Sequence, residues 1–307
     1  MSGGHHDHHH HHSGAAARGH GPAFLIAIVL NLGFVAAEVA AGILSGSMAL
    51  LADAGHNLSD VLTLLMAWGA SVLAARPPSA RFTYGLKSSS ILVAIANAAL
   101  LFVALGAILI ETIRRLADPA PVAGEMMIVV AAIGIVINGA SAFLFARGRK
   151  QDLNLRAAFQ HLLADAVVSA GVVVAGLLVV FTGARWIDPV TSLAIIAVIA
   201  WGSWGLLRDA VKMGLLAVPA GIDEGKVRAL LAAQPGVTAV HDLHIWPMST
   251  TETALTAHLV MPAGSTGDAF LHGLAHELAH EFGIGHATVQ IEMKSGEECA
   301  LERDEVV

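Results

Sequence analysis

The sequence predicts an all-α membrane bundle of six transmembrane helices, followed by a small cytosolic α+β domain. Composition is the first reason: 55% of the 307 residues are hydrophobic and only 13% are charged, whereas a soluble domain typically has about 25% charged residues. The second reason is that six apolar runs each reach the roughly 20 residues that a helix needs to cross a bilayer. Beyond about residue 213 these runs stop and charged residues return, so a separate domain outside the membrane is expected there.

The chain is expected to divide into four parts. Residues 1–20 form a His-rich tail, which we predict to be disordered and to bind metal loosely, whether it is native or a purification tag. Residues 21–212 form the transmembrane domain, residues 213–293 the cytosolic domain, and residues 294–307 a loose acidic tail. The six predicted spans are residues 24–44, 48–75, 86–113, 125–146, 155–181 and 190–207.

Basic residues predict the orientation of the bundle, because loops rich in Lys and Arg stay on the cytoplasmic side of a membrane. The loops after the second and fourth spans and the segment after the sixth hold most of them. The opposite side has only Arg114, Arg115 and Arg185, of which the adjacent pair runs against the rule. Both termini are therefore expected in the cytoplasm. The short chain without a targeting segment suits a multi-pass protein of a bacterial plasma membrane.

The residues after the last span follow the element order α-β-β-α-β. Residues 223–234 and 265–282 have helical periodicity, and residues 237–246, 253–261 and 286–293 have the patterns of strands. This order predicts a ferredoxin-like α+β arrangement, with helices packed on an open sheet. Because a domain under about 100 residues has a modest core, pairing with a second copy is expected.

Two of the spans each carry a histidine and an aspartate four residues apart, His56 with Asp60 and His161 with Asp165. Residues at i and i+4 share one face of a helix, and both pairs fall near the middle of the roughly 30 Å hydrocarbon core. A charged group at that depth costs about 2.5–3.5 kcal/mol, so four ionisable groups need a reason. Two imidazoles and two carboxylates at one point, here called the quartet, suit a tetrahedral divalent cation, zinc above all.

Hydrogen bonding between helices is the alternative explanation for polar residues in membrane spans. It accounts for one His–Asp pair, but poorly for two copies of the same pattern at similar depth. It is the expected role of four isolated polar residues, Asn31, Glu38, Asn97 and Asn138. Asp53 lies one turn before the first histidine of the quartet, and is a candidate either for this role or for lining the access path to the metal.

Several short motifs occur together along the chain. They are residues 51–60 (LADAGHNLSD), Tyr84-Gly85, His161 with Asp165, Trp186-Ile187-Asp188-Pro189, residues 241–246 (HDLHIW) and residues 286–292 (HATVQIE). In this combination the chain resembles the cation diffusion facilitators, six-span metal/proton exchangers, over nearly all of residues 21–293.

The resemblance implies that a quartet of two histidines and two aspartates carries zinc, whereas Asp-rich quartets go with manganese or iron. The family often has Arg-x-Glu shortly after Tyr-Gly, where this chain has Ser88 and Ser90. The resemblance further implies that the C-terminal domain is a cytosolic dimerisation unit that can bind metal.

The positions that match the known ligands of that domain are His241, His258, Gln290 and Glu292. Because the amide of glutamine is a poor zinc ligand, the predicted cytosolic set is His241, His258 and Glu292, and this second site is expected to be weak or altered.

Together these observations predict efflux of a divalent cation, Zn²⁺ foremost, by proton-coupled antiport with alternating access. Metal ligation requires deprotonated ligands, so zinc and protons exclude each other at the quartet. Histidine, whose ordinary pKa is about 6.5, suits such an exchange. No P-loop motif occurs, so the proton gradient is the expected driving force. The expected partners are a second copy of the chain and membrane lipid, with no nucleotide or nucleic acid.

Two other functions stay open. A membrane zinc hydrolase is one, because residues 276–280 (HELAH) match the pattern His-Glu-x-x-His. That stretch lies in the small C-terminal domain, and four protein ligands in the quartet leave no open position for catalytic water, so we predict that the chain is not an enzyme. A metal-gated sensor without transport is the other, and intact metal binding without flux would favour it.

Overall fold

The structure is a computed structural model that describes residues 21–145, 153–264, 267–293 and 301. Both predicted tails lie outside the described residues, apart from Leu301. The chain folds into two units, each of which combines two stretches of sequence. Of the described residues, the first unit comprises those within 1–62 and 101–200, and the second comprises those within 63–100 and 201–307.

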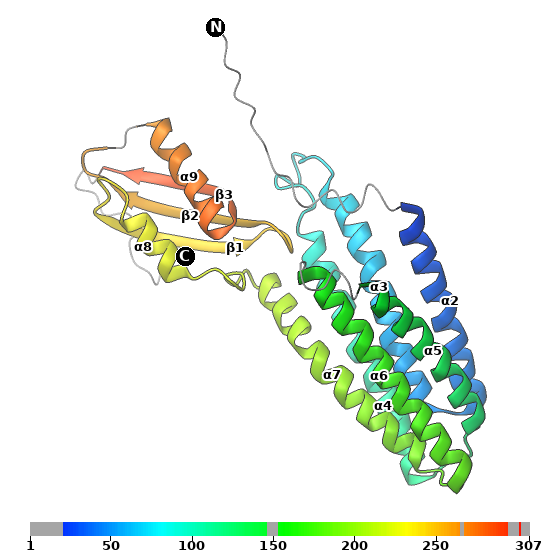
Figure 1. Cartoon of the computed structure of the whole chain (residues 1–307). Coiled ribbons are helices and arrows are strands. Elements are labelled where there is room, and N and C mark those ends of the chain that lie inside the picture. The colour runs from blue at the N-terminus through cyan, green and yellow to red at the C-terminus, as the bar shows by residue number, and fades with distance from the viewer. Residues whose placement is uncertain (1–20, 146–152, 265–266, 294–300, 302–307) are drawn as a thin grey trace. The chain divides into compact units, whose positions relative to one another are not determined.

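The first unit is helical, and its helices continue into the second unit at α3, α4 and α7. Each predicted span corresponds to one helix, with ends that differ by a few residues. The exception is α7, which continues past the expected end at residue 207 because Arg208 and Lys212, both good helix formers, follow the apolar run. The helices are α2 (Gly21–Ser45), α3 (Met48–Ala74), α4 (Ser89–Ala117), α5 (Gly124–Phe145), α6 (Leu153–Thr182) and α7 (Ile187–Gly214) (Figure 1).

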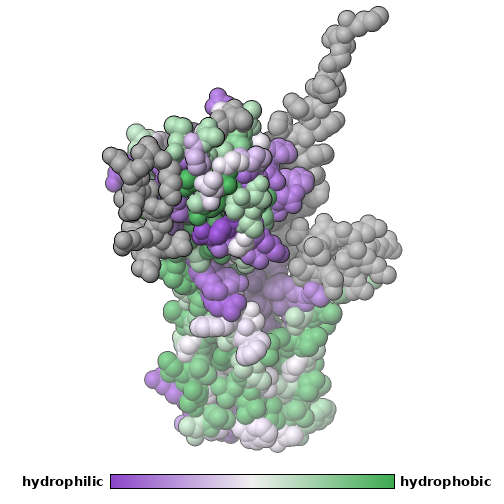
Figure 2. Space-filling model, turned by 90° about the vertical axis from the view of Figure 1, so that its left-hand side faces the viewer, coloured by the Kyte–Doolittle hydropathy of each residue, from purple (hydrophilic) through white to green (hydrophobic). Residues whose placement is uncertain are grey.

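The outer surface of these helices is apolar. Among the described residues, α4, α5, α6 and α7 are long and apolar enough to cross a membrane, whereas the 27 residues of α3 include Asp53, His56 and Asp60. Val136 is 68% exposed and Phe181 is 82% exposed, and Figure 2 shows hydrophobic residues over much of the visible surface of the helical part. Apolar side chains outside and polar ones inside are the arrangement that lipid favours.

Two glycines allow α5 and α6 to approach each other closely. A Cβ atom added to Gly176 would lie 2.8 Å from Ile128 Cγ1 and 3.1 Å from the carbonyl oxygen of Gly124. A Cβ atom added to Gly124 would lie 2.9 Å from the carbonyl oxygen of Gly176. Small residues at such contacts let transmembrane helices pack without a hydrophobic driving force. Met127 and Val172, both fully buried, continue the core between the two helices.

The second unit contains a three-stranded sheet with two helices. Its strand order is β1-β2-β3, with β1 and β2 antiparallel and β2 and β3 parallel. Leu231 of α8 and Leu278 of α9 are fully buried in one cluster with residues of the central strand. The predicted fold class, a membrane helical part followed by a small α+β domain, is therefore confirmed. The elements are α8 (Glu224–Ala232), β1 (Ala239–Pro247), β2 (Thr253–Val260), α9 (Asp268–Phe282) and β3 (Ile284–Glu292).

Backbone conformation explains two departures from the predicted elements. The helix expected over residues 265–282 begins at Asp268 in the described part of the chain, because its N-cap Gly267 has a φ of 82°, which is not a helical conformation. In β1 the pairing with β2 shifts register between His241 and His244, and Asp242 between them has a φ of 49°. This bulge redirects the side chains around it.

Within the second unit, the segment before α4 contacts the turn between β1 and β2. Ser88 Oγ donates a hydrogen bond to the carbonyl oxygen of Met248 at 3.1 Å, and the Thr250 N–H donates to Ser90 Oγ at 3.1 Å. The two serines that stand where the family often has Arg and Glu thus act here as neutral hydrogen-bonding groups.

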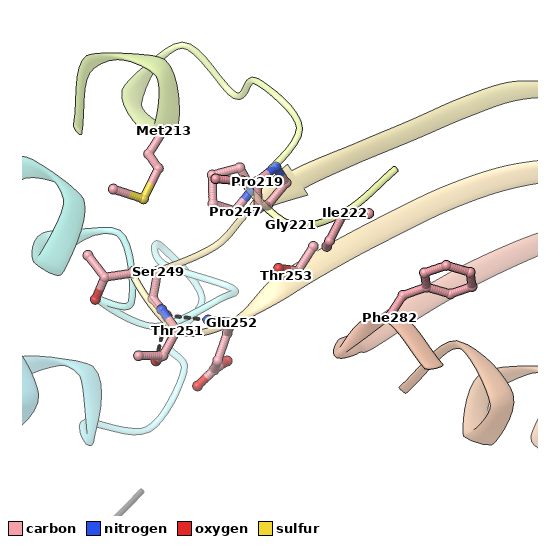
Figure 3. Close-up of a pocket in the computed structure, with 12 residues that line it drawn as sticks. Met213, Pro219, Gly221, Ile222, Pro247, Ser249, Thr251, Glu252, Thr253 and Phe282 are labelled. Atoms are coloured by element: carbon pink, nitrogen blue, oxygen red, sulfur yellow. Dashed lines mark hydrogen bonds between the residues drawn. The ribbon is translucent and has the colours of Figure 1, made fainter. Parts of the chain in front are cut away.

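The same turn borders a cavity of about 300 Å³ (Figure 3). Ser249 Oγ shapes the turn by accepting hydrogen bonds from the Thr251 N–H at 3.1 Å and the Glu252 N–H at 3.0 Å. Met213, Pro219 and other uncharged residues line the cavity, and Glu252 is the only ionisable side chain among its described lining residues. A single carboxylate is too small a ligand set for a zinc ion, so this cavity is not a metal centre.

Candidate metal centre

The position of α3, which carries the first half of the quartet, depends on a contact with the start of α7. Ser47 Oγ accepts a hydrogen bond from the Leu50 N–H at 3.1 Å, as N-cap residues do. The fully buried Asp188 carboxylate accepts from Ser47 Oγ at 2.5 Å, from the Met48 N–H at 2.8 Å and from the Ala49 N–H at 3.2 Å. A negative charge at a helix N-terminus is favourable, so Asp188 anchors α3 within the first unit.

The quartet forms where α3 faces α6. His56 Nε2 lies 3.3 Å from Asp165 Oδ1 and 3.7 Å from Asp60 Oδ2. His161 Nε2 lies 3.2 Å from Asp60 Oδ2 and 3.6 Å from Asp165 Oδ2. The two imidazole rings are edge to face, with centroids 5.7 Å apart. The structure thus brings together four residues that the sequence placed on two separate helices.

These distances fit a divalent cation with tetrahedral coordination. With zinc–ligand bonds of about 2.0–2.1 Å, the ligand atoms of a tetrahedron lie about 3.3–3.4 Å apart. The facing nitrogen and oxygen atoms are separated by 3.2–3.7 Å, and one atom from each residue lies within 4.8 Å of the others. Two carboxylates and two neutral imidazoles carry a formal charge of −2, which one divalent cation balances.

The quartet has a buried side and an exposed side. The side chains of His56 and Asp165 are 16% and 6% exposed, whereas those of Asp60 and His161 are 36% and 47% exposed. An ion held by all four would be solvated on one side and enclosed on the other. This asymmetry is suited to a site that loads from one direction.

A second layer of polar residues supports the buried side. Asn57 Nδ2 donates to Glu38 Oε2 at 2.9 Å, which joins α2 to α3. Ser169 Oγ donates to Asp53 Oδ2 at 3.2 Å, which joins α6 to α3. Glu38 therefore makes the interhelical hydrogen bond expected of it. Asp53 is 1% exposed, and its assignment to the access path stays a prediction.

Asn97 also makes an interhelical bond of the expected kind, because its Nδ2 donates to Thr63 Oγ1 at 2.5 Å. Ser169 and Asp188, in contrast, were not singled out as site residues by the sequence. Ser169 carries no signal of its own in an apolar helix. Asp188 does, since a carboxylate next to Pro189 in the first turn of a helix is typical of a helix N-terminus, although the structure has it bond to the start of α3 instead.

A second group of potential ligands lies on the sheet. His241 Nε2 is 3.3 Å from Glu292 Oε2, and His258 Nδ1 is 3.0 Å from Glu292 Oε1. His241 is on β1, His258 on β2 and Glu292 on β3. The strand register brings them together, since His241 is opposite His258, and Glu292 is opposite Val260, two residues along β2 from His258. His241 Nε2 is buried without a hydrogen bond in the described part of the chain. A buried imidazole nitrogen beside a carboxylate fits a metal ligand set, and the group will be called the cytosolic cluster.

The bulge in β1 adds a residue that the sequence did not identify. Asp242 Oδ2 lies 3.4 Å from His258 Nε2, and Asp242 Oδ1 lies 2.8 Å from His244 Nε2. The left-handed conformation of Asp242 turns its carboxylate toward the cluster. Gln290 is exposed, and its amide donates to Glu292 Oε1 at 3.1 Å. It acts as a hydrogen-bond donor to a member of the cluster.

The His-Glu-x-x-His stretch of α9 has a different environment. His276 and His280 stack with ring centroids 6.3 Å apart, and His280 Nδ1 lies 2.9 Å from Glu281 Oε1. Both histidines are exposed. Of the residues that the structure describes, only the quartet and the cytosolic cluster bring three or more His or acidic ligand atoms together.

Comparisons with known proteins show the family to which the chain belongs. Residues 24–213 match the family description "Cation efflux transmembrane domain", and residues 219–294 match "Cation efflux protein, cytoplasmic domain". The zinc transporter ZitB of Escherichia coli (strain K12) is 36% identical over 281 residues, which cover 90% of each chain.

Two further relatives are bacterial. The cadmium, cobalt and zinc/H(+)-K(+) antiporter of Bacillus subtilis (strain 168) is 32% identical over 276 residues, 88% of each chain. The solved metal-bound C-terminal domain of the CzcD transporter from Cupriavidus metallidurans is 36% identical, with a TM-score of 0.22, over 23% of this chain and 99% of its own. The chain therefore belongs to the cation diffusion facilitators, and it is a membrane transporter of divalent metal cations rather than an enzyme.

Proposed function

We propose that this chain exports Zn²⁺ from the cytoplasm in exchange for protons, and that His56, Asp60, His161 and Asp165 bind the transported ion. One observation carries the proposal: these side chains, from two helices, place ligand atoms 3.2–3.7 Å apart. The relatives support it, since one is named a zinc transporter and another a cadmium, cobalt and zinc/H(+)-K(+) antiporter.

The ligand types favour zinc over harder cations. Imidazole suits zinc and other transition metals, whereas magnesium, calcium and manganese prefer sites made of oxygen atoms. Two nitrogens and two carboxylate oxygens also match the tetrahedral coordination that zinc prefers. We therefore assign zinc as the main substrate.

Proton exchange follows from the same ligands. A protonated imidazole cannot bind a metal, so protons arriving from the outer side displace zinc and return with the emptied site. In this mechanism the bundle alternates between states that open the quartet to one side of the membrane at a time. Residues 21–212 perform transport, both termini lie in the cytoplasm, and the host membrane is a bacterial plasma membrane.

The cytosolic cluster fits a resident zinc ion. His241, His258 and Glu292 would hold it, and it would link the three strands of a domain that pairs with a second copy of the chain. Such an ion contributes folding free energy, because the ligand set is complete only in the folded state. We propose that residues 213–293 dimerise and sense zinc in this way.

The test of the transport site is zinc uptake into proteoliposomes that contain a pH-sensitive dye. Asp60→Ala and His161→Ala should each abolish zinc-driven proton movement, because each removes one of four ligands. Asp118→Asn, at an exposed carboxylate after α4, should behave like the unaltered protein. Uptake that survives both substitutions would place the transport path elsewhere, and zinc binding without uptake in the unaltered protein would favour a sensor.

A further inference from the structure

Two buried carboxyl groups, outside the quartet, face each other within the first unit. Glu38 on α2 is 0% exposed and Asp53 on α3 is 1% exposed. The two groups lie within hydrogen-bonding reach of each other. Neither takes part in the proposed binding of zinc.

Each of the two carboxyl groups has one oxygen with a donor and one without. Glu38 Oε2 accepts from Asn57 Nδ2 at 2.9 Å, and Asp53 Oδ2 accepts from Ser169 Oγ at 3.2 Å. The other two oxygens, Glu38 Oε1 and Asp53 Oδ1, are buried and have no hydrogen-bond partner in the described part of the chain. Since an ionised carboxylate is only an acceptor, two facing carboxylates cannot satisfy each other.

Apart from the histidines of the quartet, the described helices α2, α3 and α5 offer no cationic side chain to compensate two negative charges here. The sequences of α2, α3 and α5 contain no Lys or Arg, and the only one in α6 is Arg156 in its first turn. Apart from Arg156, the other ionisable side chains on α3 and α6 are those of the quartet, His56 and Asp60 on α3 and His161 and Asp165 on α6. On α5 the only ionisable side chain is Glu125 at its start. Two uncompensated charges at this depth would be very costly.

A single proton resolves both problems. If Glu38 Oε1 carries a proton, it donates to Asp53 Oδ1, and both buried oxygens gain a partner at once. The pair then has one negative charge instead of two, as is found when two carboxyl groups share a site.

The pair is close enough to the quartet to respond to a metal ion. Asp53 lies one helical turn from His56, and Glu38 is bonded to Asn57, the residue next to His56. Binding of a divalent cation raises the local charge by two and favours the ionised form of a nearby carboxyl group. By linkage, the proton in turn disfavours the metal.

We propose that Glu38 and Asp53 share one proton when the quartet is empty and release it when a divalent cation binds there. The O–H bond of Glu38 breaks, the electron pair stays on Oε1, and the proton leaves to water on the exposed side of the quartet, where Asp60 and His161 lie. This proton-binding site rests on the proposed transport function. It adds one proton that is exchanged for the metal ion but is held by residues outside the quartet.

The test counts the protons released per bound zinc ion. Calorimetric titration of the purified full chain with zinc chloride, in two buffers of different ionisation enthalpy, gives both zinc affinity and proton release. Glu38→Gln keeps the side-chain shape, since its amide oxygen can accept from Asn57 and its amide nitrogen can donate to Asp53, but it has no titratable proton. We expect release to fall by about one proton per quartet-bound zinc ion. Protons released by other histidines cancel in the comparison.

Glu125→Gln is the matched control, because Glu125 is exposed in the first turn of α5, and its proton release should equal that of the unaltered protein. Equal release by Glu38→Gln and the unaltered protein would overturn the proposal. Failure of both to bind zinc at the quartet would instead overturn the proposed transport site.

A second measurement does not depend on the folding of a variant. The infrared difference spectrum between zinc-bound and metal-free unaltered protein should show the loss of one protonated carboxyl band. The band should be missing from the difference spectrum of Asp53→Asn, in which no carboxyl pair exists. A spectrum of the unaltered protein without this loss would also overturn the proposal.

Discussion

At the residue scale, we infer that the chemical identity of the four quartet side chains decides which ion the proposed site accepts. His56 and His161 contribute imidazole, and Asp60 and Asp165 contribute carboxylate. Carboxylate oxygens suit manganese, whereas imidazole suits zinc. In the proposed site the histidines would set selectivity, and the aspartates would balance the charge of the ion.

We expect His56→Asp to lower zinc uptake by at least about tenfold and to raise manganese uptake relative to zinc, because it replaces a nitrogen ligand by an oxygen ligand. Uptake of each metal by proteoliposomes, at equal protein content, measures the ratio. The control is Asp209→Asn at an exposed position near the end of α7. An unchanged ratio of zinc to manganese uptake in His56→Asp would contradict the role given to the imidazole.

At the element scale, the quartet depends on the relative positions of α3 and α6. Asp188 fixes the N-terminus of α3 through two backbone amides and Ser47. Gly124 and Gly176 hold α6 close to α5. A shift of either helix would separate ligand atoms that lie on different helices, so these contacts matter for metal binding although none touches the ion.

Asp188→Ala should destabilise the chain by about 1–3 kcal/mol, because the buried amides of Met48 and Ala49 lose their acceptor. It should also weaken zinc binding, since α3 loses its anchor. Asp188→Asn retains an acceptor oxygen, so its stability should lie between that of Asp188→Ala and that of the unaltered protein. Thermal unfolding in detergent, with and without zinc, measures the stability and the zinc-dependent stabilisation of the three proteins. An Asp188→Ala protein as stable as the unaltered one would refute the anchoring role.

At the scale of the whole molecule, the described residues contain two candidate metal sites, one in each unit. A ligand that binds the folded chain raises its Tm in a concentration-dependent way. Sites without shared partners contribute nearly additively. The zinc-dependent rise in Tm therefore reports on the quartet and on the cytosolic cluster together.

His258→Ala should lose part of the zinc-dependent rise in Tm and keep zinc uptake at saturating zinc, because it removes a ligand of the cytosolic cluster and leaves the quartet intact. His272→Ala, at an exposed histidine of α9, should change neither quantity. Differential scanning calorimetry of the full chain, with chelator or with zinc, makes the comparison. If zinc raises the Tm of His258→Ala as much as that of the unaltered protein, the cytosolic cluster does not bind zinc.

The sequence by itself determined the helical spans, the order of the elements after them, and the His–Asp pairs. The reason is that helical periodicity and apolar run length are local properties, so spacing along one helix already says which residues share a face. The resemblance of the motifs pointed in the same way to His241, His258 and Glu292.

Only the tertiary structure decided which faces meet. It joined Asp188 to the start of α3 across 140 residues, turned Asp242 toward His258 through a bulge in β1, and set Glu38 against Asp53. Each of these contacts links side chains from different elements, and their distances depend on how helices and strands pack, which no local pattern encodes. The candidate ligands could be predicted from the sequence. The groups that position them, and the carboxyl pair beside them, could be identified only from the packing of the helices and strands.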